Sequence, residues 1–333
     1  MSSPTIGATE RALYSDRSVI RQHAMRRTLW TMTPQVASLA HASSTLSLVG
    51  PQNRHLAGLV EANGVAQNGA EWICAAKAQL AETIHQEGPI TTRQLGDTHP
   101  HLAVPLAYGT GHVSAHSRVA LLLGFDGEVL RTRPSGSWTN SQYAWSSVRD
   151  WSPGAFDARD EDAASVELLD RYLRAFGPVT ETDMQWWTGW TKTKVRRALR
   201  RLAPREVAIG DTTGWLSPSD HDGASEEEPW VALLPGLDPT TMGWKQRDWY
   251  VEPSMVPLLF DRNGNAGPTV WVDGRVVGGW IQHPSGEIRY KLLDATAENR
   301  RADLDAAAKV LARVYAETRH KVRFPSPILR ELS

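Results

Sequence analysis

A dense run of positive charge is the feature of this 333-residue chain with the clearest chemical use. Residues 191–205 hold seven basic side chains and no carboxylate: Lys192, Lys194, Arg196, Arg197, Arg200, Arg201 and Arg205. An apolar stripe at helical spacing lies between them, formed by Val195, Ala198, Leu199 and Leu202. The run therefore predicts a helix with one packed face and one cationic face, which can neutralise the phosphates of a nucleic acid. The alternative is a solvated basic face that has no partner.

A second cationic group lies on a predicted β-hairpin at 128–145. Arg131 and Arg133 stand at its first strand, and the rings of Trp138 and Tyr143 follow. Basic and aromatic side chains at a hairpin can contact the DNA backbone or wedge a base step. The alternative is that they pack on their own hairpin.

Tryptophan is abundant, with 14 residues in the chain, and is densest at Trp186, Trp187 and Trp190. These rings could stack on bases. Their place within a predicted pair of helices favours packing in the core instead.

We predict no metal site and no small-molecule cofactor. No cysteine lies near His99, His101, His112 or His116. His112 and His116 are four residues apart, but no carboxylate stands between them at metalloprotease spacing. The segment 261–272 begins like a calcium loop, yet Gly and Glu are absent where such a loop needs them, which indicates a turn.

The elements that would position these residues open with a repeated phrase. Gly88-Pro89-Ile90-Thr91 and Gly177-Pro178-Val179-Thr180 each follow an amphipathic helix pattern and precede a second short one. Helix, turn, Thr cap and second helix is how a helix-turn-helix begins. A third helix and two short strands follow each copy, which predicts two winged-helix units.

The pattern predicts an α+β protein with tandem winged-helix units, a C-terminal β-rich module and a closing helix. The expected regions are a helical N-terminal layer at 1–70, a first winged-helix unit at 71–150, a second at 160–217, an acidic linker at 218–230, and the C-terminal module at 231–333. Within them we expect helices at 8–24, 35–48 and from Pro51 to about Val60 in the first layer, and a last helix at 298–319.

Net charge, cysteine content and hydropathy limit the cellular compartments and binding modes that the chain could have. The formal net charge is −1, so the basic run acts locally, within a screening distance of roughly 10 Å. The lone Cys74 cannot form an internal disulfide, and no apolar stretch reaches the length of a membrane span. We expect a cytoplasmic protein, at the nucleoid when bound to DNA.

Segments in four regions of the chain, in order, carry a resemblance to a known family. They are the segment 25–30 (MRRTLW), the second Gly-Pro copy with Trp186-Trp187-Thr188-Gly189, the segment 233–247 (LLPGLDPTTMGWKQR), and the paired segments 261–264 (DRNG) and 272–280 (VDGRVVGGW). Together they resemble the bacterial winged-helix family of the AlkZ and YcaQ DNA glycosylases. The resemblance implies a DNA-binding concave face and repair of alkylated or crosslinked DNA. It also makes Arg27, Trp30, Asp238, Lys245 and Arg247 candidates to line a cleft.

The chain departs from the family at its catalytic signature, which is Gln, an apolar residue, then Gln or Asp. That signature precedes the segment matched by 25–30 and would fall before residue 1, and no Gln-x-Gln or Gln-x-Asp lies near it here. Trp30 replaces the family's His and Arg27 its Gly. Either the reading frame starts late or this member lacks the element, so catalytic residues stay unassigned.

The sequence thus predicts a double-stranded-DNA-binding protein of this family, linked to repair, with its catalysis left open. The alternatives are a non-catalytic transcription factor or damage sensor, and a winged-helix protein whose basic face meets an acidic protein.

Overall fold

The computed structural model describes residues 5–136, 140, 142–220, 228–319, 322 and 325–332. The chain divides into two compact units. The N-terminal unit comprises Gly7–Arg171 and Thr188–Ala203, and the C-terminal unit comprises Met1–Ile6, Tyr172–Trp187 and Pro204–Ser333. Trp138 and most of the predicted acidic linker lie outside the described residues.

The N-terminal layer is less helical than its sequence predicted. After α1 (Ile6–Glu10) and a π-helical turn (Arg11–Ser15), the chain forms strand β1 (Ile20–His23), a 3-10 turn (Met25–Arg27) and strand β2 (Leu29–Met32). The helix predicted through residue 24 is therefore wrong beyond the turn. Pairing of β1 with β2, in which Ile20 faces Met32, overrides the local helical pattern.

Helical structure is continuous from α2 (Pro34–Ala40) through a π-helical turn (His41–Thr45) into α3 (Leu46–Ala62). The predicted start of a new helix at Pro51 is wrong, because Pro51 lies inside α3. Leu56 and Val60 of α3 are buried in the main core of the unit, and this packing outweighs the hydrogen bond that proline cannot donate.

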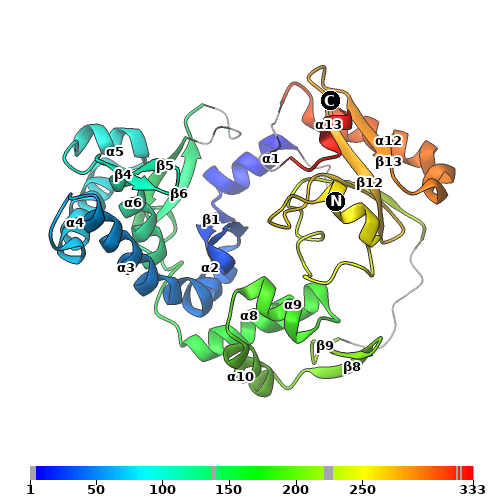
Figure 1. Cartoon of the computed structure of the whole chain (residues 1–333), viewed down its shortest axis with the longest axis horizontal. Coiled ribbons are helices and arrows are strands. Elements are labelled where there is room, and N and C mark those ends of the chain that lie inside the picture. Colours follow the sequence, from blue (N-terminus) through cyan, green and yellow to red (C-terminus); the bar gives the residue numbers. More distant parts are fainter. Residues whose placement is uncertain are drawn as a thin grey trace. The chain divides into compact units, whose positions relative to one another are not determined.

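The first Gly-Pro copy forms the elements that its sequence predicted, with additions (Figure 1). These are α4 (Gly69–Glu87), β3 (Ile90–Thr91), α5 (Thr92–Thr98), β4 (Pro105–Tyr108), β5 (Gly111–Ser114), α6 (Ala115–Asp126), β6 (Val129–Pro134), β7 (Tyr143–Ser147) and α7 (Val148–Trp151). The β4–β5 hairpin is an element that the sequence pattern does not predict. The predicted hairpin β6–β7 lies inside a five-stranded sheet of order β2-β1-β6-β7-β3.

The second copy runs through α8 (Glu161–Phe176), α9 (Glu181–Thr188), α10 (Lys192–Leu202), β8 (Arg205–Ile209) and β9 (Thr212–Leu216). Its order of elements is as predicted. The boundary between the two compact units passes through α8 and α9, and α10 belongs to the N-terminal unit.

The C-terminal module contains a four-stranded antiparallel sheet of order β10-β11-β12-β13. Its elements are β10 (Val231–Leu234), a 3-10 turn (Pro253–Met255), α11 (Val256–Leu259), β11 (Thr269–Val272), β12 (Arg275–Gln282), β13 (Ile288–Leu292), a 3-10 helix (Ala295–Arg300), α12 (Arg301–Tyr315) and α13 (Leu329–Leu332). Leu304 and Ala308 of α12 pack in one core with Trp280 of β12. The predicted closing helix thus exists, but its α-helical part is shorter at both ends.

Candidate nucleic-acid interface

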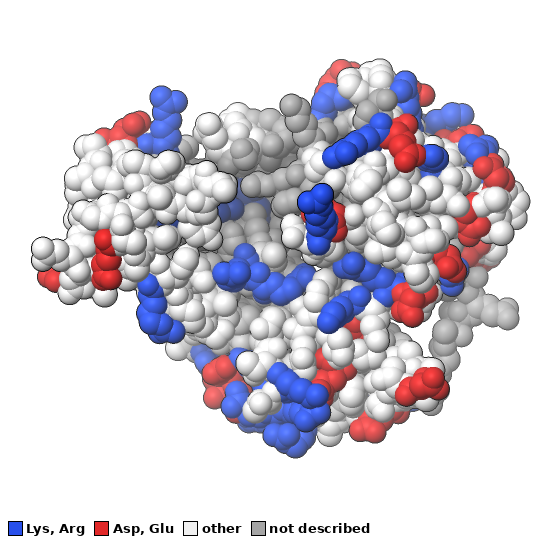
Figure 2. Space-filling model, in the orientation of Figure 1, with Lys and Arg blue, Asp and Glu red and all other residues white. Residues whose placement is uncertain are grey.

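Helix α10 has the two faces that its sequence predicted. Thr191 caps its start, where the threonine hydroxyl accepts the backbone N–H of Lys194 at 3.3 Å. Val195, Ala198 and Leu199 are buried. The other face exposes five basic side chains, Lys192, Arg196, Arg197, Arg200 and Arg201. Figure 2 shows Lys and Arg side chains gathered over this helix.

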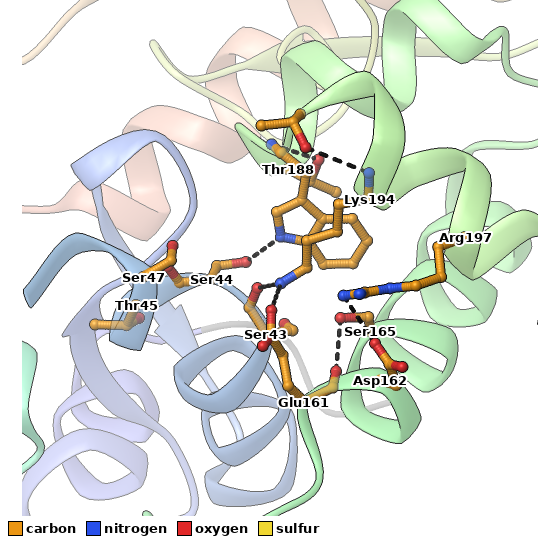
Figure 3. Close-up of polar contacts among 12 residues, drawn as sticks. Ser43, Ser44, Thr45, Ser47, Glu161, Asp162, Ser165, Thr188, Lys194 and Arg197 are labelled. Atoms are coloured by element: carbon orange, nitrogen blue, oxygen red, sulfur yellow. Dashed lines mark hydrogen bonds and ion pairs between the residues drawn. The ribbon is translucent and has the colours of Figure 1, made fainter.

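A carboxylate of α8 partly neutralises this face. One oxygen of the Asp162 carboxylate forms an ion pair with Arg197 at 2.8 Å (Figure 3). The other oxygen forms an ion pair with Arg201 at 2.7 Å. Both guanidinium groups remain about half exposed, at 46% and 50%. An exposed pair of this kind contributes little stability, but it holds two cations of successive turns in fixed positions.

Lys194 has a different role from its neighbours. Its side chain is only 13% exposed and forms an ion pair with Glu161 of α8. The ammonium also donates to the backbone carbonyl of Ser43 and lies 5.0 Å from the Trp190 ring centroid. Figure 3 shows Lys194 between the serine segment and Glu161. We therefore take Lys194 out of the exposed DNA-contact set and assign it to joining α10 to the π-helical turn.

A polar cavity of about 330 Å³ lies beside the start of α10. Side chains and backbone from three segments line it: Ala24, Arg26, Arg27, Ser44, Ser47, Leu48, Thr188, Gly189 and Trp190. The indole N–H of Trp190 donates to the Ser44 hydroxyl at 2.8 Å, and the Ser47 hydroxyl donates to the Ser44 carbonyl at 2.7 Å. Two arginines and several hydroxyls without a carboxylate make the lining suited to an anion.

The turn that carries the cavity's arginines has an unusual backbone. Arg26 and Arg27 have φ values of 57° and 60°, a left-handed conformation that costs energy for a side chain of this size. Gly189 packs against this turn, and a Cβ at that position would lie 3.2 Å from the Arg26 nitrogen. The close approach, together with the Gly189 φ of 73°, explains the glycine.

Comparisons with known proteins identify the family and the fold of the chain. A family model described as DNA glycosylase AlkZ-like matches residues 3–314. The chain belongs to the AlkZ-like DNA glycosylase family. Among solved structures, the DNA glycosylase AlkZ of Streptomyces sahachiroi matches with a TM-score of 0.74 and 19% identity, over 97% of this chain and 86% of that one. At that identity the match shows a shared fold. No curated protein matches the chain.

The hairpin arginines of this AlkZ-like chain lie against aromatic rings. Arg131 sits 3.8 Å from the Tyr143 ring centroid and 5.4 Å from that of Trp145. Arg133 is 57% exposed and reaches Glu10 at 3.5 Å. Arg131 therefore packs on its own sheet, while Arg133 stays at the surface.

Of the remaining cleft candidates, Arg27 lines the polar cavity and Trp30 supports its turn. The Trp30 indole N–H donates to the Met25 carbonyl at 3.2 Å.

Two of the three candidates in the C-terminal unit of the AlkZ-like chain, Asp238 and Arg247, hold loops. Asp238 accepts the Thr240 backbone N–H at 2.8 Å. Arg247 donates to the Gly264 carbonyl at 2.9 Å, and its guanidinium carbon lies 4.2 Å from the Phe260 ring centroid. Lys245 has an exposed side chain. The predicted turn nearby is confirmed, because the Asp261 carboxylate accepts the Asn263 and Asn265 backbone N–H groups.

The histidines considered for metal bind protein groups. His99 contacts the Thr83 hydroxyl at 2.7 Å, and His116 contacts the Thr92 carbonyl at 2.9 Å. Burial lowers the pKa of both rings, which favours their neutral form. Within the described segments, no group of three His, Cys, Asp or Glu side chains could hold a metal ion. No described helix combines the length and apolar character that crossing a membrane requires.

Two features of the site escaped the sequence analysis. Asp162 lies about thirty residues from α10, and no local spacing connects the two. The π-helical turn could have been found from the hydroxyl-rich segment 43–47, since hydroxyls in the middle of a helix are unusual and favour irregular turns. Trp187 and Trp190 are each 7% exposed, which confirms their predicted place in the core.

Proposed function

We propose that this AlkZ-like chain binds double-stranded DNA through the exposed face of α10 and acts in the repair of alkylated or crosslinked bases. The family match over residues 3–314 carries the proposal. The five exposed cations of α10 support it, because each phosphate that they neutralise releases a counterion and favours binding. Such a protein would work in the cytoplasm, at the nucleoid.

We assign two winged-helix units, at 71–150 and 160–217. In each, the β-branched residue before the second helix pairs with a strand of the following hairpin. Ile90 pairs with Trp145 of β7, and Val179 forms a bridge with Trp215 of β9. This pairing supports the assignment, since a winged helix joins its short first strand to its wing.

The polar cavity beside α10 supplies a second contact for the DNA backbone in this proposal. Arg27 and the hydroxyl of Ser47 line it without an opposing carboxylate. A phosphate in the cavity would fix the register of the duplex relative to α10 without reading its sequence.

The chemistry of the family is hydrolysis of an N-glycosidic bond. Water adds its oxygen to C1′ of the sugar and loses a proton to the solvent, while the C1′–N bond breaks and its electron pair leaves with the base. An N-alkylated purine is already cationic and leaves readily, so an enzyme needs mainly to position water and to stabilise the developing sugar cation. The chain has no Gln-x-Gln or Gln-x-Asp near residues 25–30, and we assign no catalytic residue.

The alternative is a DNA-binding damage sensor without chemistry. A single-turnover assay on duplex DNA with one 7-methylguanine, beside a titration of the undamaged duplex, separates the two functions. Release of free base establishes the glycosylase. Salt-sensitive binding without release establishes the sensor, and loss of all duplex binding contradicts both.

A further inference from the structure

A second cavity, of about 380 Å³, lies in the N-terminal unit among α3, α6 and the β4–β5 hairpin. Leucines of α3 and α6, together with Phe125, form its apolar part. Its polar lining consists of Arg27, Gln52, His55, Tyr108 and Arg118, with no Asp or Glu. The volume falls within the range of roughly 300–1,000 Å³ typical of small-molecule sites.

An aromatic ring and a cation that line this cavity lie close together. Tyr108 is 46% exposed. The Arg118 guanidinium carbon lies 5.2 Å from the Tyr108 ring centroid, and His55 meets the same ring edge-on at 5.8 Å. Within the described part of the chain, Arg118 has no carboxylate or carbonyl partner, although its side chain is half buried.

The fold holds this arrangement in place. The side-chain oxygen of Asn63, at the end of α3, accepts the Ala107 backbone N–H at 2.8 Å and so fixes β4 on the helix. Gly109 begins the tight turn after Tyr108 with a φ of 59°, where it has no Cβ to strain. Tyr108 is therefore positioned by the hairpin that the sequence analysis missed.

The lining residues indicate what kind of ligand fits the cavity. An apolar cavity with an exposed ring takes a planar group, and an arginine without a carboxylate partner takes an anion. Arg27 contributes to the lining of both this cavity and the polar one beside α10. A nucleotide has both parts, a planar base and an anionic phosphate.

We propose that this cavity binds one nucleotide, with the base against Tyr108 and the apolar lining and the phosphate at Arg118. The nucleotide can be an unstacked member of a DNA chain or a free mononucleotide. The first source rests on the proposed function, and the second does not.

Two titrations distinguish the sources. Calorimetry with free dAMP, deoxyadenosine and deoxyribose 5-phosphate tests the free nucleotide, and dAMP should bind more tightly than either part. Fluorescence polarisation compares a duplex that has one bulged adenosine with the fully paired duplex. A preference for the bulge identifies the DNA source.

Substitutions at Arg118 and Tyr108 test whether the binding measured in either titration takes place in the cavity. Arg118→Ala should weaken the positive interaction about tenfold to a hundredfold, because a charge-assisted hydrogen bond is lost. Tyr108→Ala should weaken it at least about fivefold, and Tyr108→Phe should retain it. Arg54→Ala removes an exposed charge of α3 that does not line the cavity, and it should change binding less than twofold.

Unchanged binding of both dAMP and the bulged duplex by folded Arg118→Ala and Tyr108→Ala overturns the proposal. Equal affinity for dAMP and deoxyribose 5-phosphate also overturns it, since only an anion site would remain. If no duplex binds at all, the proposed function fails, while the dAMP titration still decides the cavity.

Discussion

The two Gly-Pro copies of this chain share the threonine cap of their second helix but differ in what surrounds it. In the first copy, Thr91 and Gln94 form a reciprocal capping box at the exposed start of α5. In the second, Thr180 and Asp183 cap α9 in the same way, but both are buried. The capping chemistry is therefore local, and its energetic weight depends on burial.

The third helices differ far more than the caps. Helix α6 buries residues on most of its surface, including Val119, Ala120 and Leu123. Helix α10 buries a narrow stripe and exposes five cations. One sequence phrase thus introduces a core helix in the first copy and a surface helix suited to phosphates in the second. The phrase predicts the cap, and the exposure of the third helix depends on its own sequence.

The largest expected effect is on the core helix. Leu123→Ala in α6 should lower the free energy of unfolding by about 2–5 kcal/mol, because the buried side chain leaves a cavity. Arg200→Ala on α10 should change it by less than about 0.5 kcal/mol. Urea unfolding followed by circular dichroism measures both. Equal losses would show that the two helices do not differ as described.

The next largest effect is a difference in stability between variants of the two caps. Asp183 is 2% exposed and also accepts the backbone N–H groups of Lys245 at 2.9 Å and Gln246 at 3.1 Å. Asp183→Ala leaves these buried donors without an acceptor and should cost about 2–4 kcal/mol. Gln94→Ala in the exposed box should cost about 0.5–1 kcal/mol. Thermal melting of both variants tests the contrast, which similar shifts would contradict.

The sequence predicted the copies, their caps and the two-faced α10 because each rests on local spacing. It failed at β1, where pairing with β2 decides the structure, and at the β4–β5 hairpin, whose turn Gly109-Thr110 has no strong signal. Local spacing predicts that Lys194 is exposed like its neighbours, since its burial depends on Ser43 and Glu161, which are distant in sequence. Contacts of this kind appear only once the chain is folded.

A gain in DNA affinity is expected when the carboxylate opposing α10 is removed. Asp162→Asn frees Arg197 and Arg201 from their ion pairs and should tighten duplex binding about threefold to tenfold at low salt. Glu167→Gln, which removes an exposed α8 carboxylate paired with Arg171, is the matched control. Weaker binding by Asp162→Asn would mean that the ion pairs orient the arginines productively.

The smallest effect concerns pH. Burial, with a contribution from the Arg131 charge, lowers the pKa of His23 to about 3. The unfolded chain, with a His pKa near 6.5, then binds more protons between these values, so this contribution to stability is complete above about pH 6.5 and is lost as pH falls toward 3. His23→Gln should flatten the pH dependence of the melting temperature in that window. The exposed His112→Gln should leave the curve unchanged.

The most direct test of the account is the salt dependence of duplex binding by Arg196→Ala/Arg200→Ala. The matched control is Lys309→Ala/Arg313→Ala, which removes two exposed charges from α12 at the same spacing. Each phosphate contact contributes roughly 0.9 to the slope of log affinity against log salt, so the α10 variant should lose about 1.8 and the control none. A slope that the α10 variant leaves unchanged would contradict DNA binding by this helix and favour an acidic protein partner.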